Sequence, residues 1–174
     1  MGLCGYVKAN KLTAEYIIRQ DMKKREDAKT ISFEEYNNRN FELIENNITK
    51  KINIKTIFNI KENNIEINNE QKNTESNKIW VVISNKTMGK QINSILEEYK
   101  NRTGVIDTIV KEAIEYNING VIVDFEEIEE KETIKRFIIE LTPKLREVGI
   151  DTCVVLNKNF EKNDYINIVD YIIE

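Results

Sequence analysis

Two acidic residues, Asp124 and Glu126, stand at the end of an apolar run, where they could carry out acid–base chemistry. The run, NGVIVDFEE at 119–127, reads as a buried parallel strand. Because side chains alternate along a strand, Asp124 and Glu126 should point to the same side as Ile122. The C-terminal ends of such strands are where α/β enzymes keep their reactive groups. A carboxylic acid near a carboxylate in a partly dry site gains proton affinity, as a general acid requires.

The composition narrows the chemistry to carboxylates. The 174 residues include no histidine, which excludes Ser-His-Asp and Cys-His catalysis and the usual histidine-bearing zinc sites. Cys4 and Cys153 are too far apart for a metal-ligand spacing, and Cys153 lies in an apolar strand as a core residue. Glycosidases work with Asp and Glu alone, so carboxylate catalysis remains. We expect no metal and no cofactor, a hard-cation site at Asp124, Glu126 and Glu127 being the minor alternative.

The charge pattern restricts the partners. The net charge is −4, and Lys and Glu are mixed along the chain without a basic stripe, so nucleic acid is not an expected partner. No apolar run approaches the length of a membrane span, and the N-terminus lacks the apolar core of a signal peptide. The length indicates one domain with a sizeable core.

Strands and helices are predicted to alternate from residue 79 onward. Pro143 should kink or divide the last helix, and Gly149 should end it. This alternation predicts a parallel sheet with right-handed crossovers. The predicted strands are 79–84, 120–126, 151–157 and 168–173, and the predicted helices centre on 92–99, 105–114 and 134–145.

The first part of the chain is less regular. ISFEEYN at 31–37 has the β-rich start of a short strand, and residues 13–30 are charged and weakly periodic, as in a connector. IKTIFNIKENNIEI at 54–67 predicts a strand that runs into a hairpin, with the turn at Glu62-Asn63-Asn64. The polar residues 68–78 predict an exposed loop.

NGVIVDFEE resembles the DGxDxDxE signature of glycoside hydrolase family 18, in its bacterial spore-cortex-type branch. The surrounding segments also resemble that branch, in the order of its second to sixth strands. GLCGYVKANKL at 2–12 looks like the end of a bacterial Src-homology-3-like domain. The segments that resemble the strands and helices of the branch are IKTIFNIKENNIEI (54–67), KIWVVISNK (78–86), RTGVIDTIVKEAIEYNINGVIVDFE (102–126), RFIIELTPKLREVGIDTCVVLN (136–157) and YINIVDYII (165–173).

The resemblance implies an α/β fold of the (β/α)₈ TIM-barrel type. A whole barrel of this kind has eight strands and about 250 residues, and this sequence stops at Glu174. We therefore expect an incomplete, C-terminally truncated barrel at 31–174, with about six of the eight strands. A remnant of the Src-homology-3-like domain at 1–12 and a connector at 13–30 would precede it.

The resemblance also implies hydrolysis of β-1,4 links after N-acetylglucosamine in chitin or peptidoglycan. Members of the family retain the anomeric configuration, and the 2-acetamido oxygen of the substrate is the nucleophile. By position, Glu126 matches the general acid/base, and Asp124 matches the residue that orients the acetamido group. The glycan is the implied partner, and the cell wall, the spore or the extracellular space is the implied location.

Two motif positions depart from the family pattern. Asn119 replaces the first Asp and keeps its hydrogen-bonding capacity, so it stays a candidate substrate-binding residue. Ile122 replaces an inward Asp or Asn and cannot form a hydrogen bond with Asp124, which we expect to weaken the carboxylate relay. These departures leave two alternatives open: a degenerate remnant that binds glycans without hydrolysis, and an α/β domain whose acidic motif is coincidental.

Three further residues are candidate substrate contacts. Ser84 and Asn85 close the strand 79–84 at the expected active-site end, where they either line the cleft or begin a loop. Trp80 could provide a stacking surface for a sugar ring, but its place at the start of that strand favours core packing.

Overall fold

The computed structural model of the protein describes residues 26–61, 64–68, 78–158 and 160–174. The segment predicted as a domain remnant at 1–12, most of the predicted connector and nearly all of the predicted loop at 68–78 lie outside these residues.

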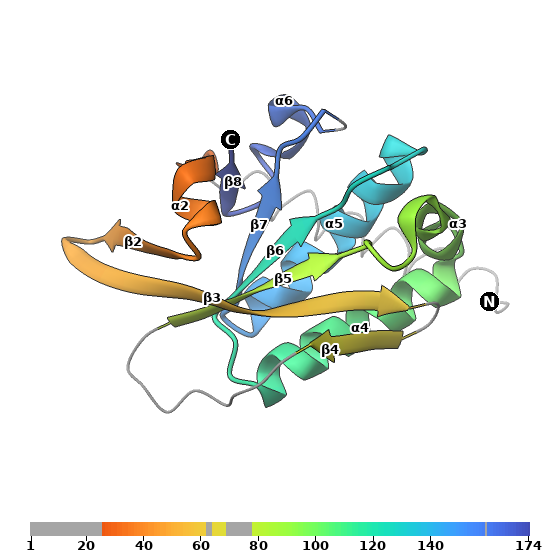
Figure 1. Ribbon diagram of the computed structural model, residues 1–174, viewed down its shortest axis with the longest axis horizontal. Coiled ribbons are helices and arrows are strands. Elements are labelled where there is room, and N and C mark those ends of the chain that lie inside the picture. Colours follow the sequence, from red (N-terminus) through yellow and green to blue (C-terminus); the bar gives the residue numbers. More distant parts are fainter. Residues whose placement is uncertain (1–25, 62–63, 69–77, 159) are drawn as a thin grey trace, which may run out of the picture.

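A single curled sheet forms the centre of the described fold (Figure 1). Its parallel part is the incomplete barrel that the sequence predicts, with about six of eight barrel strands. Two further strands, β2 (Asn40–Glu45) and β4 (Asn64–Asn68), pair antiparallel with β3. The parallel strands, in spatial order, are β1 (Lys29–Ile31), β8 (Tyr171–Ile173), β7 (Asp151–Val155), β6 (Gly120–Asp124), β5 (Lys78–Ser84) and β3 (Ile48–Lys61).

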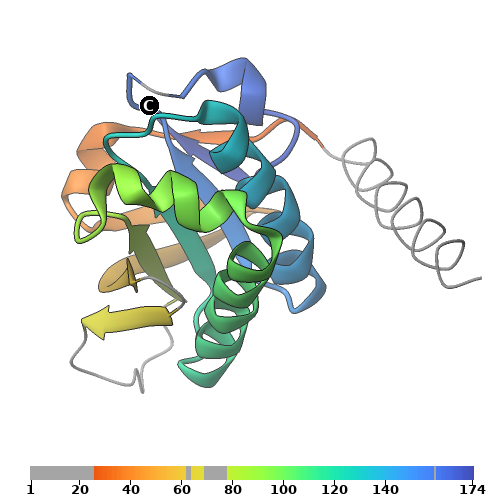
Figure 2. The same cartoon turned by 90° about the vertical axis from the view of Figure 1, so that its right-hand side faces the viewer.

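Three helices cover the outer face of the sheet, where Figure 2 shows them in front of the strands. They are α3 (Ile92–Glu97), α4 (Tyr99–Glu115) and α5 (Lys131–Glu147), close to the predicted positions. Apolar side chains from the outer face of the strands pack against the apolar faces of these helices in one large buried cluster. Among its members are Val121, Val123 and Phe125, which alternate with the inward-facing residues of β6, as predicted.

The inner face of the sheet holds a second buried cluster, centred on Trp80. The indole is fully buried and makes edge contacts with Phe41, at 5.5 Å between ring centroids, and with Tyr171, at 5.1 Å. Gly120 makes room for this ring, because a Cβ atom there would lie 2.4 Å from Cε2 of Trp80. The inner face is therefore filled by side chains, as in closed barrels.

A short helix stands where the sequence predicted a strand. β1 takes in the last two residues of the predicted connector and ends at Ile31, and α2 (Phe33–Asn37) follows, so the strand predicted at 31–37 is wrong. Ser32 caps α2: its Oγ accepts from the N–H of Glu35 at 3.2 Å, and its own N–H donates to Oε2 of Glu35 at 2.9 Å. This capping box outweighs the β propensity of the flanking residues.

Two other elements test the predicted boundaries. The hairpin between β3 and β4 is confirmed, since β3 ends at Lys61 and β4 begins at Asn64. Pro143 does not divide α5, which is continuous over its 17 residues and ends before Gly149, at φ 76°. The pyrrolidine ring of Pro143 removes one backbone N–H donor from the helix near its last turn. In the same region, the hydroxyl of Thr142 donates to the carbonyl of Ile138 at 2.7 Å.

Candidate active site

Strand β6 delivers Asp124 and Glu126 to the C-terminal edge of the sheet. Asp124 ends the strand, and Glu126 follows in the loop with an exposed side chain. Between them, Phe125 is fully buried on the outer face, and its ring stacks on Phe137 of α5 at 5.8 Å. This anchor fixes the alternation, so Asp124 faces the inside of the curled sheet and Glu126 stands just beyond it.

A tyrosine from α2 reaches Asp124 across the inner face. The phenol of Tyr36 donates to Oδ2 of Asp124 at 2.7 Å, and only 6% of Tyr36 is exposed. Burial first, and then the charge of Asp124, raise the pKa of Tyr36 well above its ordinary value, while the Arg39 guanidinium over its ring opposes this. The phenol is therefore a permanent donor at neutral pH. Within the described residues, this is the only side-chain hydrogen bond found for Asp124.

The amide of Asn85 holds the backbone of Glu126 from the neighbouring strand end. Its Oδ1 accepts from the N–H of Glu126 at 2.9 Å, and its Nδ2 donates to the carbonyl of Glu126 at 2.6 Å. Asn85 is fully buried, and its own carbonyl accepts from the N–H groups of Met88 and Gly89 at 2.9 and 2.7 Å. Of the two roles considered for Asn85, lining a cleft or beginning a loop, the structure gives it a loop-supporting one.

Two more asparagines fix the loop that carries Glu126, and neither was predicted as a site residue. Nδ2 of Asn157 donates to the carbonyl of Phe125 at 2.7 Å, and Oδ1 of Asn93 accepts from the N–H of Glu130 at 3.1 Å. Glu127 lies in the left-handed region at φ 55°, a conformation that such support can maintain. Asn157 directly follows the apolar run CVVL at 153–156, which was the available signal for a role at a strand end.

Polar residues on β5 and β3 lie next to Asp124 across the C-terminal ends of the strands. Ser84 is paired in register with Asp124, and Asn59 with Ser84, and both are buried. Ser84 Oγ accepts from the N–H of Lys86 at 3.2 Å. Asn59 was not among the predicted site residues, although its place between the outward-facing Phe58 and Ile60 could have indicated it.

Trp80 and Asn119 are not brought to this edge. Trp80 is paired in register with Gly120 at the start of β6, and its full burial leaves no ring face for a sugar. Asn119 precedes β6, and its Oδ1 accepts from the N–H of Ile79 at 3.0 Å. Both residues therefore lie at the N-terminal end of the parallel strands, opposite Asp124.

The described residues assemble no metal-binding group. Within them, no set of three or more His, Cys, Asp or Glu side chains could hold a metal ion, including the alternative set at Asp124, Glu126 and Glu127. Cys153 is fully buried in the inner cluster, as expected for a core cysteine, and burial raises the pKa of its thiol. None of the helices in the described ranges has the length and hydropathy needed to cross a membrane.

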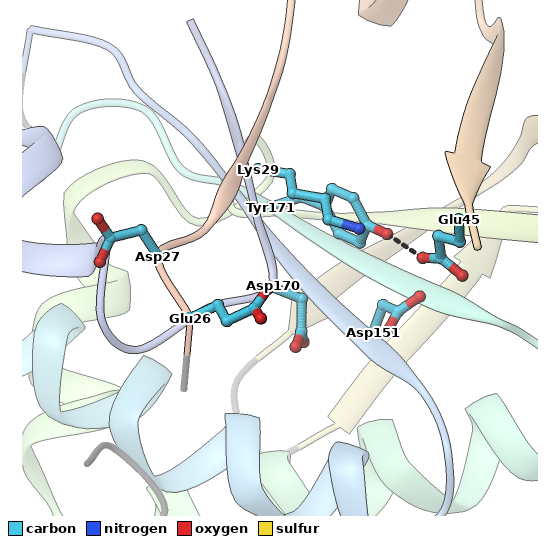
Figure 3. A pocket seen from close by; sticks show the side chains of 7 residues that line it. All are labelled: Glu26, Asp27, Lys29, Glu45, Asp151, Asp170 and Tyr171. Carbon is cyan, nitrogen blue, oxygen red and sulfur yellow. Dashed lines mark hydrogen bonds between the residues drawn. The ribbon is translucent and has the colours of Figure 1, made fainter. Parts of the chain in front are cut away.

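A polar cavity of about 280 Å³ lies at the opposite end of the strands from Asp124 (Figure 3). The phenol of Tyr171 donates to Glu45 there and so ties β8 to β2 across the inner face. Burial, followed by the charges of Asp170 and Glu45, raises the pKa of Asp151 to about 6. The cavity is lined by Glu26, Asp27, Lys29, Glu45, Asp151, Asp170 and Tyr171.

Solved structures share this fold. YdhD of Bacillus subtilis, a proposed sporulation-specific glycosylase, matches 77% of this chain and 52% of its own at 14% identity, with a TM-score of 0.62. A class V chitinase of Pseudomonas fluorescens Pf-5 matches 67% of this chain and 44% of its own at 16% identity, with a TM-score of 0.60. The spore cortex-lytic enzyme SleL of Bacillus megaterium QM B1551 matches 64% and 31% at 18% identity, with a TM-score of 0.53.

These likenesses establish the fold. The chain spans between 31% and 52% of the length of these three structures. No protein-family model matches the sequence, and no curated protein matches it. The described residues thus form an incomplete barrel of the fold that these structures share, with Asp124 at the C-terminal end of one of its central strands and Glu126 in the loop that follows.

Proposed function

We propose that the protein is a glycoside hydrolase-like domain that acts on polymers containing N-acetylglucosamine. The reaction is a retaining hydrolysis in which the 2-acetamido oxygen of the substrate attacks the anomeric carbon. Glu126 protonates the leaving oxygen and then, as a base, activates the water that completes the reaction. Asp124 orients the acetamido group and stabilises the positive charge that it acquires.

One observation carries this proposal: Asp124 ends a central barrel strand on its inward side, and Glu126 follows two residues later in the loop at the C-terminal edge of the sheet. This is the edge at which barrel enzymes place their catalytic groups. Glu126 is exposed to solvent, as an acid that must reach a polymer has to be. The buried polar residues Ser84 and Asn59 extend the site along β5 and β3 and are candidate contacts for the sugar.

The test is hydrolysis by the purified protein. We expect release of reducing ends from chitin oligomers or from peptidoglycan, and a fall in kcat of about 100-fold or more in Glu126→Gln, the loss typical of removing a general acid. The kcat of Asp124→Asn should fall by a similar factor. Glu129→Gln is the matched control, because Glu129 is an exposed glutamate of the same loop that pairs with Lys90 on the surface. The catalytic assignment fails if Glu126→Gln retains the wild-type rate.

A second candidate function is glycan binding without hydrolysis. Ile122 favours it, because this fully buried apolar side chain lies below Asp124, where a polar partner would support the carboxylate. Sedimentation of the protein with purified cell walls, without release of soluble fragments, would select this function over the enzyme.

The substrate and location follow from the same proposal. The structural neighbours include proteins named for sporulation or the spore cortex and class V chitinases. We therefore place the activity at the cell wall or spore, and parallel assays on peptidoglycan and on chitin oligomers decide between the two glycans.

A further inference from the structure

The inner face of β6 lacks a hydrogen-bonding partner for Asp124 on its own strand. The preceding inward residue, Ile122, is fully buried and carries no polar atom. On the adjacent strand, Ser84 is in register with Asp124, but the hydrogen bond found for its Oγ is the one from the N–H of Lys86. Asp124 must therefore take its support from another part of the fold.

That support comes from α2, which connects β1 to β2. Tyr36 is the buried residue of this helix and belongs to the same inner cluster as Ile122 and Trp80. Its phenol meets Oδ2 of Asp124 at 2.7 Å, a normal length for a hydrogen bond to a carboxylate. The other oxygen has no hydrogen bond within the described part of the chain and is left for a substrate.

We propose that Tyr36 is the positioning residue for Asp124 and that it supplies, from α2, the hydrogen bond that Ile122 cannot provide. This inference rests on the proposed function and adds a residue outside the acidic motif to it. The phenol holds one carboxylate oxygen in place, so that the other faces the acetamido nitrogen of the sugar. Because Tyr36 donates and never accepts this proton, Asp124 is kept as the acceptor that a developing positive charge requires.

The geometry of α2 makes this a fixed contact. The capping box of Ser32 and Glu35 fixes the start of the helix, and the Arg39 guanidinium lies 5.2 Å from the centre of the Tyr36 ring. The carbonyl of Arg39 also accepts from the N–H of Ile54 on β3, at 2.9 Å. The start of the helix is thus capped, the segment that follows it is tied to the sheet, and the phenol is preorganised over Asp124.

The test compares Tyr36→Phe with Tyr171→Phe in the full chain. Both substitutions remove only a hydroxyl, from a buried tyrosine of the same cluster that donates to a carboxylate. Tyr171 meets Glu45 at the far end of the strands, so it controls for the loss of a buried hydrogen bond. The measurements are kcat and KM on the glycan that the wild type cleaves, across pH 4–9, together with the urea midpoint of unfolding.

We expect Tyr36→Phe to lower kcat about 10- to 100-fold with KM changed less than about threefold, since the contact acts on the charged transition state. The pH profile of kcat should also change, because the lost phenol contacts a carboxylate of the proposed site directly. Tyr171→Phe should lower the urea midpoint and leave the pH profile of kcat unchanged.

The inference is overturned if Tyr36→Phe retains the wild-type kcat and pH profile, or if Tyr171→Phe shifts both as much as Tyr36→Phe does. Failure of the proposed function looks different: the wild type itself would then release no reducing ends and bind no chitin oligomer in calorimetry. In that case, both assignments fall together, whereas an active wild type with an unaltered Tyr36→Phe variant refutes the role of Tyr36 alone.

Discussion

The side-chain amide of Asn85 brackets the peptide groups of Glu126, accepting from its N–H at 2.9 Å and donating to its carbonyl at 2.6 Å. Asn85 follows the last residue of β5, and Glu126 follows β6. The position of the proposed acid is therefore set by the neighbouring strand as well as by its own. A buried amide with both groups satisfied in this way resists substitution.

Asn85→Asp should separate these two hydrogen bonds. The carboxylate keeps an acceptor for the N–H of Glu126 but faces its carbonyl without a donor, so the loop should shift. We expect a fall in the free energy of unfolding of about 1–3 kcal/mol, the usual penalty for an unsatisfied buried group. We also expect a loss of kcat of about 10- to 100-fold, because small displacements of a catalytic group are costly. Urea unfolding and glycan hydrolysis measure the two effects.

Asn93→Asp is the matched control for this prediction. Asn93 is also a buried amide of the same region, accepting from the N–H of Glu130 and donating to the carbonyl of Lys90 at 3.1 Å each. The same chemical change should therefore destabilise the fold to a similar extent, with a smaller loss of kcat. Equal losses of kcat in both variants would show that loop stability, and not the placement of Glu126, accounts for the effect.

Gly120→Ala should be strongly destabilising. Its Cβ would lie 2.4–2.5 Å from three atoms of the Trp80 ring, which is itself locked between Phe41 and Tyr171. Overpacking of this kind typically costs 1–3 kcal/mol, and we expect about 3 kcal/mol because the neighbouring rings block any escape. Equilibrium unfolding in urea measures the change.

A second glycine provides the comparison for Gly120. Gly104 lies inside α4, and a Cβ there would meet nothing within 4 Å. Gly104→Ala should therefore stabilise the protein by about 0.5–1 kcal/mol, the usual gain from replacing a helical glycine. If Gly120→Ala is tolerated as well as Gly104→Ala, then Trp80 does not pack over Gly120 as described.

Asp151 should make the stability depend on pH. Its pKa is raised to about 6 in the folded state, from an ordinary value of 3.8, first by burial and then by the charges of Asp170 and Glu45. The folded state therefore binds the proton more tightly, and its stabilising contribution is complete below about pH 4 and lost as the pH rises through 6. Asp151→Asn should raise the free energy of unfolding at pH 7.5 by about 1–3 kcal/mol, with little change at pH 4.

Asp107→Asn is the control for this pH dependence. Asp107 is largely exposed on α4 and pairs with Lys144 at 2.6 Å, so its loss should change stability by less than about 1 kcal/mol at either pH. A series of urea titrations from pH 4 to pH 8 gives the comparison. A stability difference between wild type and Asp151→Asn that stays constant over this range contradicts the prediction.

The parallel part of the sheet was predictable because each buried strand is a short apolar run between polar segments. Alternation along the strand predicted the inward side for Asp124, and the outward side chains of Val121, Val123 and Phe125 agree with this for β6. The same alternation also predicts an inward side chain for Asn59, because it lies between the outward-facing Phe58 and Ile60. The helix α2 was not predicted because the segment begins with residues typical of a strand, although Ser32 and Glu35 have the spacing of a capping box.

The tertiary contacts were out of reach of local patterns. Tyr36 and Asp124 are 88 residues apart, and only the curl of the sheet brings α2 over the end of β6. The strand β2 was also missed, because Phe41 and Leu43 alternate with polar residues over only six positions. The full burial of Trp80 depends on Phe41 from that strand, and so it could not be decided from the strand of Trp80 alone.

The pairing of β1 with β8 has a consequence for the order in which the protein folds. Thr30 donates a hydrogen bond to Glu174, which is 144 residues away, and the strands of these two residues run side by side. The crossovers from β5 to β8 join neighbours in both sequence and space, so they can form while the chain is still emerging from the ribosome. β1 can pair only after β8 has been synthesised, because β8 is its neighbour in the sheet. Synthesis of β8 therefore determines when β1 can dock and when α2 can bring Tyr36 over Asp124.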